Sequence, residues 1–247
     1  MLFQPKLADA LVQLVMGFNL RRWILAALSR RELGVTQADW KYLRFSYAQF
    51  AEDLLVEALL PKPQGFYIDV GAYHPVQISN TYLFYRKGWH GLVIDANPDT
   101  ITLFRQRRPR DLAVEAAISE QEGEALFNVY RAGPNNRLRL PGHQAGDHIP
   151  EEKPERVLRV QTRTLKSILE KHLPAGQVID FMSVDCEGAD LGVLKSNDWT
   201  RFLARVLVVE DWQPLEHSEI CSYLKARGYT FWAAAGVSRI FRLQSEM

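Results

Sequence analysis

The chain has 247 residues, 47% of them hydrophobic, which is enough to bury the core of one α/β domain. Thirty basic and twenty-nine acidic residues leave a formal net charge of +1, so no overall charge favours nucleic acid or an anionic membrane. The two cysteines, Cys186 and Cys221, lack any CxxC spacing. This argues against a disulfide framework or a zinc cage and predicts a reducing, cytoplasmic location.

The N-terminal part is predicted to be helical. Apolar residues recur at helical spacing from Lys6 to Leu28, and a second helical pattern covers residues 47–60. We expect residues 1–60 to form a helical extension that covers one face of the core or contacts a second copy of the chain. Asn19, Arg21 and Arg22 interrupt the apolar segment, so we expect no signal peptide and no transmembrane helix. A membrane-surface anchor is the less favoured alternative.

From residue 61 to residue 247 the pattern predicts one sheet domain. Short apolar runs alternate with helical segments after Pro63, as in a mainly parallel sheet covered on both faces. Five runs are almost continuously apolar, which is typical of buried parallel strands: 65–70, 91–96, 112–118, 179–185 and 205–211.

The last two runs, 229–235 and 238–243, are separated only by Gly236 and Val237, so they should pair as an antiparallel hairpin. The predicted fold class is therefore α/β, with a Rossmann-like seven-stranded mixed sheet. A parallel sheet closed by such a hairpin is the arrangement of class I S-adenosylmethionine-dependent methyltransferases. Residues 131–156, with four prolines and three glycines, should form a long loop that acts as a lid or substrate-selecting segment.

The loop after the first strand argues against a dinucleotide. Binding the pyrophosphate of NAD needs a GxGxxG turn, and the segment here reads DVGAYHP, with only Gly71. S-adenosylmethionine has no phosphate; it needs an acid near its cationic end and a second acid for the ribose hydroxyls. Asp69 and Asp95 fit these roles. Asn97 should cap the helix that Pro98 begins, and the adenine should lie near Ala117 and Ile118.

Acids gather after the fourth and fifth predicted strands, where ligands of such sheets bind. The segments read VDCEGAD and VLVVEDW, and they bring Asp185, Glu187, Glu210 and Asp211 to one edge. Crowded carboxylates require a bound cation, raised pKa values or solvent.

Seven segments follow one another along the chain: FAEDLL, FYIDVGAYHP, SNTYLFYRKGW, GLVIDANP, TLKSIL, IDFMSVDCEGADLGVLKSNDW and VLVVED. With these segments in this order, the sequence resembles the FkbM family of S-adenosylmethionine-dependent methyltransferases. The resemblance runs from about Ser46 to Asp211. Two positions differ from the usual pattern: Ala51 stands where a glycine is common in FxED segments, and Cys186 where a valine is more usual.

The resemblance implies O-methylation, usually of sugar hydroxyls in polysaccharides, glycolipids or natural products. It assigns cofactor binding to residues at the ends of the first two strands and in the loops after them: Asp69, Gly71, Ala72, Asn80, Asp95 and Asn97. Ala96, between two of these residues, is expected to contribute to the same site. It assigns the acceptor side to His74, Asp185 and Glu187, which are also the candidates for the general base that takes the proton of the hydroxyl. As a further hypothesis, Asp185, Glu210 and Asp211 bind Mg²⁺, as in catechol O-methyltransferase-like enzymes.

Other functions remain possible from the sequence alone. These are an NAD-dependent sugar oxidoreductase, a noncatalytic protein that retains the fold, and a nucleic-acid methyltransferase. The last is disfavoured by the near-zero charge and by the absence of an N-P-P-Y or D-P-P-Y tetrad. We expect a small-molecule or glycan acceptor as partner, no nucleic acid and no peripheral membrane contact. The basic segment RQRRPR, residues 105–110, should be a solvated helix face.

Overall fold

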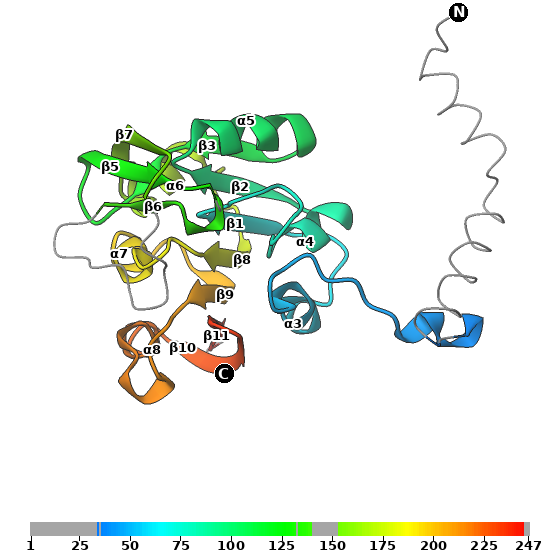
Figure 1. Ribbon diagram of the computed structural model, residues 1–247. Helices are drawn as coiled ribbons and strands as arrows, with labels where there is room; N and C mark the ends of the chain where they lie inside the picture. The colour runs from blue at the N-terminus through cyan, green and yellow to red at the C-terminus, as the bar shows by residue number, and fades with distance from the viewer. Residues whose placement is uncertain (1–33, 35, 132, 140–152, 245–247) are drawn as a thin grey trace, which may run out of the picture. The chain divides into compact units, whose positions relative to one another are not determined.

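The computed structural model describes residue 34 and residues 36–131, 133–139 and 153–244 (Figure 1). Contacts divide the chain into a unit of residues 1–45 and a unit of residues 46–247. In the first unit, the described residues form one 3-10 helix, η2 (Gln37–Tyr42). The helix expected over Lys6–Leu28 lies outside the described residues. No described helix has the length and apolar character needed to cross a bilayer.

The larger unit is built on a seven-stranded sheet with the order β10-β11-β9-β8-β1-β2-β3. Strands β9, β8, β1, β2 and β3 run parallel, whereas β11 pairs antiparallel with both β9 and β10, so the predicted mixed sheet and terminal hairpin are confirmed. The strands are β1 (Phe66–Val70), β2 (His90–Asp95), β3 (Leu112–Glu115), β8 (Ile179–Val184), β9 (Ala204–Glu210), β10 (Tyr229–Ala235) and β11 (Ser238–Leu243).

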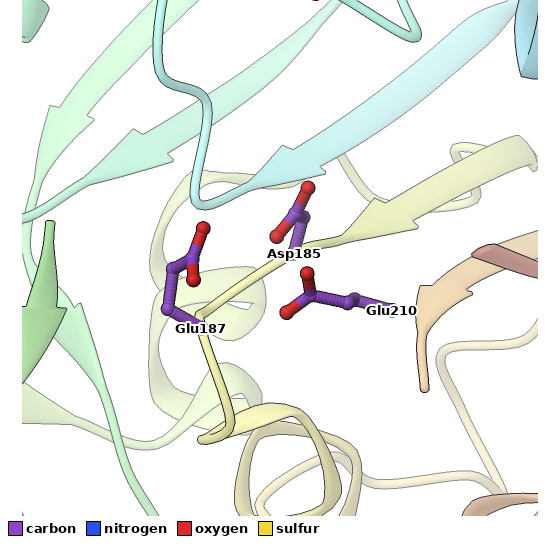
Figure 2. Close-up of side chains that lie close together, drawn as sticks. All are labelled: Asp185, Glu187 and Glu210. Atoms are coloured by element: carbon purple, nitrogen blue, oxygen red, sulfur yellow. The ribbon is translucent and has the colours of Figure 1, made fainter. Parts of the chain in front are cut away.

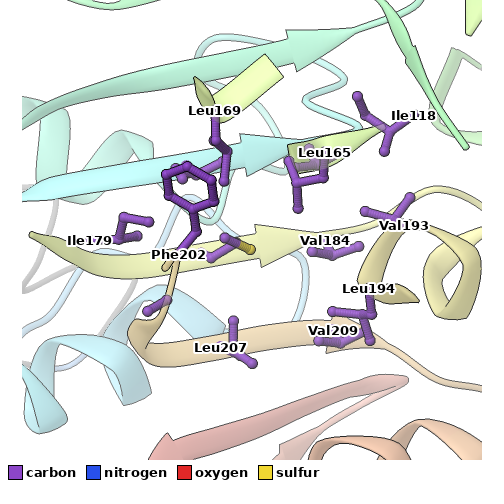
Figure 3. Close-up of a cluster of buried hydrophobic side chains, with 14 of the residues drawn as sticks. Ile118, Leu165, Leu169, Ile179, Val184, Val193, Leu194, Phe202, Leu207 and Val209 are labelled. Carbon is purple, nitrogen blue, oxygen red and sulfur yellow. The ribbon is translucent and has the colours of Figure 1, made fainter. Parts of the chain in front are cut away.

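Helices cover both faces of this sheet because its strands are apolar on both sides. In β1, Ile68 and Val70 belong to a core cluster with α6, α7 and α8, part of which is drawn in Figure 3. Tyr67 points the other way, into a cluster with α3 and α4, as the two-residue period of a strand requires. The helices are α3 (Glu52–Leu59), α4 (Tyr82–Arg86), α5 (Pro98–Arg107), α6 (Leu165–His172), α7 (Asp190–Lys195), α8 (Glu219–Lys225) and the 3-10 turn η4 (Leu215–His217).

A second, four-stranded sheet with the order β4-β7-β5-β6 was not predicted. The run 112–118, expected as one strand, divides between β3 and β4 and so joins two sheets. Strands β5 and β7 flank the expected lid, of which 140–152 lies outside the described residues. The members are β4 (Ala117–Ile118), β5 (Gly123–Val129), β6 (Arg137–Leu138) and β7 (Arg156–Arg163), with the 3-10 turn η3 (Gly133–Asn135). The sequence signal was weak because β5 and β7 carry many exposed polar residues.

Two acids of the FAEDLL segment attach α3 to its surroundings. The Asp53 carboxylate accepts from the Ser46 hydroxyl at 2.6 Å and from the Tyr47 amide at 2.8 Å. The Glu52 carboxylate accepts from the Phe50 amide at 2.7 Å and from the Ser238 hydroxyl of β11 at 3.0 Å. Helix α3 therefore belongs to the larger unit, which begins at Ser46, whereas we expected the division between residues 60 and 61.

The expectation of a solvated RQRRPR face is wrong for Arg108, whose side chain is fully buried. Its guanidinium pairs with the Asp111 carboxylate at 2.6 Å and donates to the Tyr67 hydroxyl at 2.8 Å and the Thr81 hydroxyl at 3.0 Å. A buried charge is stable only with such partners, and a charge pattern in sequence does not reveal them.

Candidate active site

A pocket lies at the carboxyl ends of β1, β2, β8 and β9. Because these strands are parallel, their last side chains lie at the same edge of the sheet. Most residues predicted for the cofactor and acceptor line it. They are Asp69, Gly71, Ala72, His74, Asn80, Asp95, Ala96, Ala117, Ile118, Asp185, Glu187 and Glu210. The prediction from the sequence therefore grouped residues up to 141 positions apart, from Asp69 to Glu210, and these residues line one pocket.

The two predicted cofactor acids are held by hydrogen bonds from neighbouring loops. Asp69 accepts from the Thr81 hydroxyl at 2.5 Å, and Thr81 in turn accepts from Arg108. Asp95 accepts from the Asn97 amide at 2.7 Å. The Asn97 side chain accepts from the Asp99 amide at 3.0 Å and so caps α5, as predicted; it does not itself line the pocket.

Gly71 is needed where β1 leaves the sheet. Its φ is +81°, and a Cβ atom there would lie 1.7 Å from the Asp185 carbonyl oxygen. Only glycine permits this backbone conformation and this close approach. Gly71 therefore brings the loop after β1 against the start of the segment after β8, so that Asp69 and Asp185 share one pocket.

The DCEGAD segment forms a turn that Asp190 holds together. The Asp190 carboxylate accepts from the Cys186 amide at 2.8 Å and from the Gly188 amide at 3.0 Å. Glu187 has a left-handed backbone with φ of +52°. Asp185 and Glu187 line the pocket, whereas the Cys186 side chain also packs against the core cluster beneath. The role of Asp190 was missed because its spacing alone does not distinguish a turn-forming acid from a ligand.

Three carboxylates face one another at the end of the pocket next to β8 and β9 (Figure 2). One oxygen each of Asp185, Glu187 and Glu210 lies within 4.8 Å of the others. The predicted fourth acid, Asp211, is not part of this group. Its carboxylate accepts from the Ser218 hydroxyl at 2.5 Å and the Gln213 amide at 3.0 Å, so it organises the turn before α8.

Burial makes ionisation of these acids unfavourable. It raises the pKa of Asp69, which the charge of Arg108 opposes, and it raises the pKa of Asp95 to about 7, which the hydrogen bond from Asn97 opposes. Burial and the nearby charges of Asp190 and Glu187 raise the pKa of Asp185 well above its ordinary value.

Glu187 and Glu210 are shifted in the same direction. Burial and the Asp190 charge raise the pKa of Glu187 to about 7, although the Arg137 guanidinium opposes the shift. Burial and the neighbouring acids raise the pKa of Glu210 strongly. This end of the pocket thus concentrates carboxyl groups whose ionised forms the described residues stabilise only in part.

The geometry around His74 argues against its predicted role as a base. Its Nδ1 accepts from the Val76 amide at 3.1 Å and from the Gln77 amide at 2.9 Å. The neutral ring therefore carries its proton on Nε2 and has no free lone pair. Burial and the charge of Arg107 lower the pKa of His74, so the ring stays neutral and its Nε2–H group can only donate.

Several pocket residues were not predicted individually; they come from the second sheet, from its loops and from the loop after β1. Arg137 and Leu138 of β6 and Phe127 of β5 line the pocket, as do Tyr73 and Gly133. A Cβ at Gly133 would lie 2.6 Å from the Tyr73 ring, so these two loops are in close contact. Gly133, Arg137 and Leu138 lie within the segment 131–156 that the sequence predicted to be a lid or substrate-selecting loop, but no motif singled them out, since their position depends on strand pairing.

Comparison with solved structures gives distant matches. A Burkholderia thailandensis 1,6-didemethyltoxoflavin-N1-methyltransferase with bound S-adenosylhomocysteine is 13% identical, with 99% of this chain and 92% of that chain covered and a TM-score of 0.42. A methyltransferase from Geobacter sulfurreducens is 14% identical, with 98% of each chain covered and a TM-score of 0.43. A TehB-like methyltransferase from Corynebacterium glutamicum is 12% identical, with 92% and 96% covered and a TM-score of 0.41.

Likenesses at this level say nothing about the acceptor. No curated protein matches the chain. The family comparison is decisive: the model for the methyltransferase FkbM domain matches residues 69–231, from the first acid of the pocket into β10. This range contains the DVGA and DCEGAD segments and all three clustered carboxylates. The chain therefore belongs to the FkbM family of S-adenosylmethionine-dependent methyltransferases.

Proposed function

We propose that the protein transfers the methyl group of S-adenosylmethionine to a hydroxyl oxygen of a sugar in a glycan, a glycolipid or a natural product. The observation that supports an oxygen as the methyl acceptor is the cluster of three carboxylates at the end of the pocket, those of Asp185, Glu187 and Glu210. A neutral hydroxyl must lose its proton during transfer, and buried carboxylates beside it promote that loss. The sugar itself rests on the family resemblance.

The cofactor is proposed to lie across the ends of β1, β2 and β4. Asp69 would stand near the cationic methionine end, beside Gly71 and Ala72. The side-chain NH₂ group of Asn80 donates to the Ser183 hydroxyl at 3.0 Å. The side-chain oxygen of Asn80 would then accept from the cofactor amino group.

The adenosine half is proposed to follow β2. Asp95 would accept from the ribose hydroxyls. Ala96, Ala117 and Ile118 are buried and apolar, which suits a flat adenine ring. Asn97 would act indirectly, by fixing the start of α5 beside the ribose.

The reaction is an in-line displacement. The acceptor oxygen forms a bond to the methyl carbon while the carbon–sulfur bond breaks and its electron pair stays on sulfur, giving neutral S-adenosylhomocysteine. The hydroxyl proton leaves toward the carboxylates, with Asp185 and Glu187 as the proposed acceptors. The enzyme mainly has to hold oxygen and methyl in line at about 3 Å.

The experiment is methyl transfer from S-adenosylmethionine labelled in its methyl group to a panel of free sugars, nucleotide sugars and lipid-linked glycans. We expect label in an alkali-stable ether on a sugar oxygen. Asp185→Asn should lower the rate about 10²-fold or more, as loss of a group that assists proton removal does. Exposed Glu216 provides the matched control, and Glu216→Gln should retain the full rate.

Label found on nitrogen, carbon or nucleic acid, with none on any sugar, would refute the proposed acceptor. The family assignment already favours methyl transfer over the NAD-dependent oxidoreductase considered from the sequence. Binding of S-adenosylhomocysteine without transfer to any acceptor, even in the presence of cell extract, would favour the noncatalytic alternative.

A further inference from the structure

Glu210 presents a buried oxygen that nothing in the described structure satisfies. The residue is 6% exposed, and its Oε2 has no hydrogen-bond partner. The Trp212 side chain also makes a hydrogen bond to the Glu210 carboxylate, so part of this carboxylate is held in place. A buried acceptor without a partner costs roughly 1–3 kcal/mol, and more if it is charged. A ligand bound in the pocket would satisfy this oxygen.

The unsatisfied oxygen belongs to the group of three carboxylates. Figure 2 shows Asp185 and Glu187, from the segment after β8, facing Glu210 at the end of β9. No ion pair within 4.0 Å joins any of the three to a basic side chain of the described residues. The Arg137 guanidinium acts on Glu187 only through its charge. Three acids therefore share one space without a paired cation from the described chain.

The donor set and its size suit a small hard cation. All three donors are carboxylate oxygens, which Mg²⁺ and Mn²⁺ prefer. In an octahedral site with metal–oxygen distances of about 2.1 Å, ligand oxygens lie about 3 to 4.2 Å apart. The three oxygens lie within 4.8 Å of one another, close to this range.

We propose that Asp185, Glu187 and Glu210 bind one divalent cation, Mg²⁺ or Mn²⁺, at the acceptor end of the pocket. This set differs from the one expected from the sequence. Asp211 already accepts hydrogen bonds from Ser218 and Gln213, and Glu187 takes its place. Cation binding itself needs only the three carboxylates.

The role of the cation in transfer rests on the proposed function. Held by Asp185, Glu187 and Glu210, a divalent cation would stabilise the acceptor oxygen as its O–H bond breaks. Asp185 and Glu187 would then act as ligands, and the proton would leave to water instead of to these two carboxylates. The oxygen forms its bond to the methyl carbon, and the carbon–sulfur electron pair stays on sulfur.

The test is to titrate the whole chain with Mn²⁺ and to measure the free ion by electron paramagnetic resonance. In the same samples, binding of S-adenosylhomocysteine is measured by calorimetry. We expect one Mn²⁺ per chain, displaced by Mg²⁺. Glu210→Gln keeps the shape of the side chain and should weaken Mn²⁺ binding at least about tenfold, a loss of about 1.4 kcal/mol. Glu216→Gln, the exposed control, should leave it unchanged.

Two results would overturn the inference: no Mn²⁺ bound to the wild-type chain at about 1 mM free ion, or equal binding by the wild type and Glu210→Gln. If Glu210→Gln fails to fold by circular dichroism, Glu187→Gln, at a partly exposed position, decides in the same way. Binding of S-adenosylhomocysteine without binding of Mn²⁺ would refute the cation site and leave the proposed function unaffected. Absence of S-adenosylhomocysteine binding counts against the proposed function instead.

Discussion

At the scale of single residues, Ala51 adopts a backbone that glycine adopts more easily. Its φ and ψ are 65° and 28°, at the N-cap of α3, where its side chain makes no capping hydrogen bond. A non-glycine residue in this left-handed region costs roughly 1–2 kcal/mol. Glycine has more conformational freedom than alanine in the unfolded chain, and this offsets about 0.4–1 kcal/mol of the strain that the substitution would remove.

Ala51→Gly should therefore raise the free energy of unfolding by up to about 1 kcal/mol. The measurement is a urea unfolding curve followed by circular dichroism. Ala48→Gly, at a half-buried position in the preceding segment, is a comparison in which no left-handed strain has been removed. A destabilised Ala51→Gly variant would contradict the strain argument.

Asp95 should make stability depend on pH. Burial raises its pKa from 3.8 to about 7, so the folded protein without cofactor keeps a proton that the unfolded chain has lost. Stability contributed by the protonated form is present at low pH and decreases as pH rises from about 4 to about 7. Asp95→Asn cannot ionise, so we expect it to be more stable than the wild type by on the order of 1–3 kcal/mol at about pH 8 and by little at about pH 4.

Urea midpoints of the cofactor-free proteins at both pH values give this difference. The control is Glu115→Gln, since Glu115 is the exposed register partner of Asp95 on β3; this variant keeps Asp95 and should follow the pH profile of the wild type. An Asp95→Asn variant with the same pH profile as the wild type would mean that solvent or a neighbouring group keeps Asp95 ionised.

At the scale of elements, the junction of β1 with β8 depends on Gly71. Gly71→Ala would add both left-handed strain and a collision with the Asp185 backbone oxygen. Gly88 separates the two effects, because its φ is +97° but nothing lies within 4 Å of a Cβ built there. We expect Gly88→Ala to lose about 1 kcal/mol and Gly71→Ala roughly 3 kcal/mol or more.

Thermal and urea unfolding of both variants measure this difference, and calorimetry with S-adenosylhomocysteine measures its consequence for the pocket. Binding should be lost in Gly71→Ala, because the loop after β1 moves away from Asp185, and retained in Gly88→Ala. Equal losses of stability in the two variants would show that the contact between β1 and β8 relaxes easily.

At the scale of the whole molecule, Arg108 connects elements on one side of the sheet. The chain of contacts runs from Arg108 through Asp111 to the Gly91 amide of β2, at 3.0 Å, and through Tyr67 and Thr81 to β1 and α4. Removing one member of a buried charge pair leaves the other without compensation, which costs about 3–5 kcal/mol.

Arg108→Met keeps the length of the side chain and removes its charge, and we expect it to destabilise the protein by about 3–5 kcal/mol. Arg107→Met is the matched control, since Arg107 is exposed and should change stability by no more than about 0.5 kcal/mol. Urea unfolding compares the two. Similar losses would mean that Asp111 finds another partner when Arg108 is absent.

Part of the site could be predicted because it depends on the order of strands. Parallel strands place their carboxyl ends at one edge, so Asp69, Asp95, Asp185 and Glu210 had to approach one another once β1, β2, β8 and β9 were recognised. The sequence could not choose between Glu210 and Asp211. Successive side chains of a strand point to opposite faces, and the register of β9 with β8 and β11 turns Glu210 toward the pocket.

The sequence by itself therefore determined the seven-stranded sheet, its terminal hairpin and the family, since continuous apolar runs and short motifs are local properties of the chain. Only the tertiary structure decided which acids face one another, that Arg108 is buried, and that β5 and β6 bring Arg137 to the pocket. These features depend on contacts between distant segments. The charge state and the hydrogen-bond partners of a side chain depend on its burial and on the strands that pair around it. The type of residue alone does not determine either.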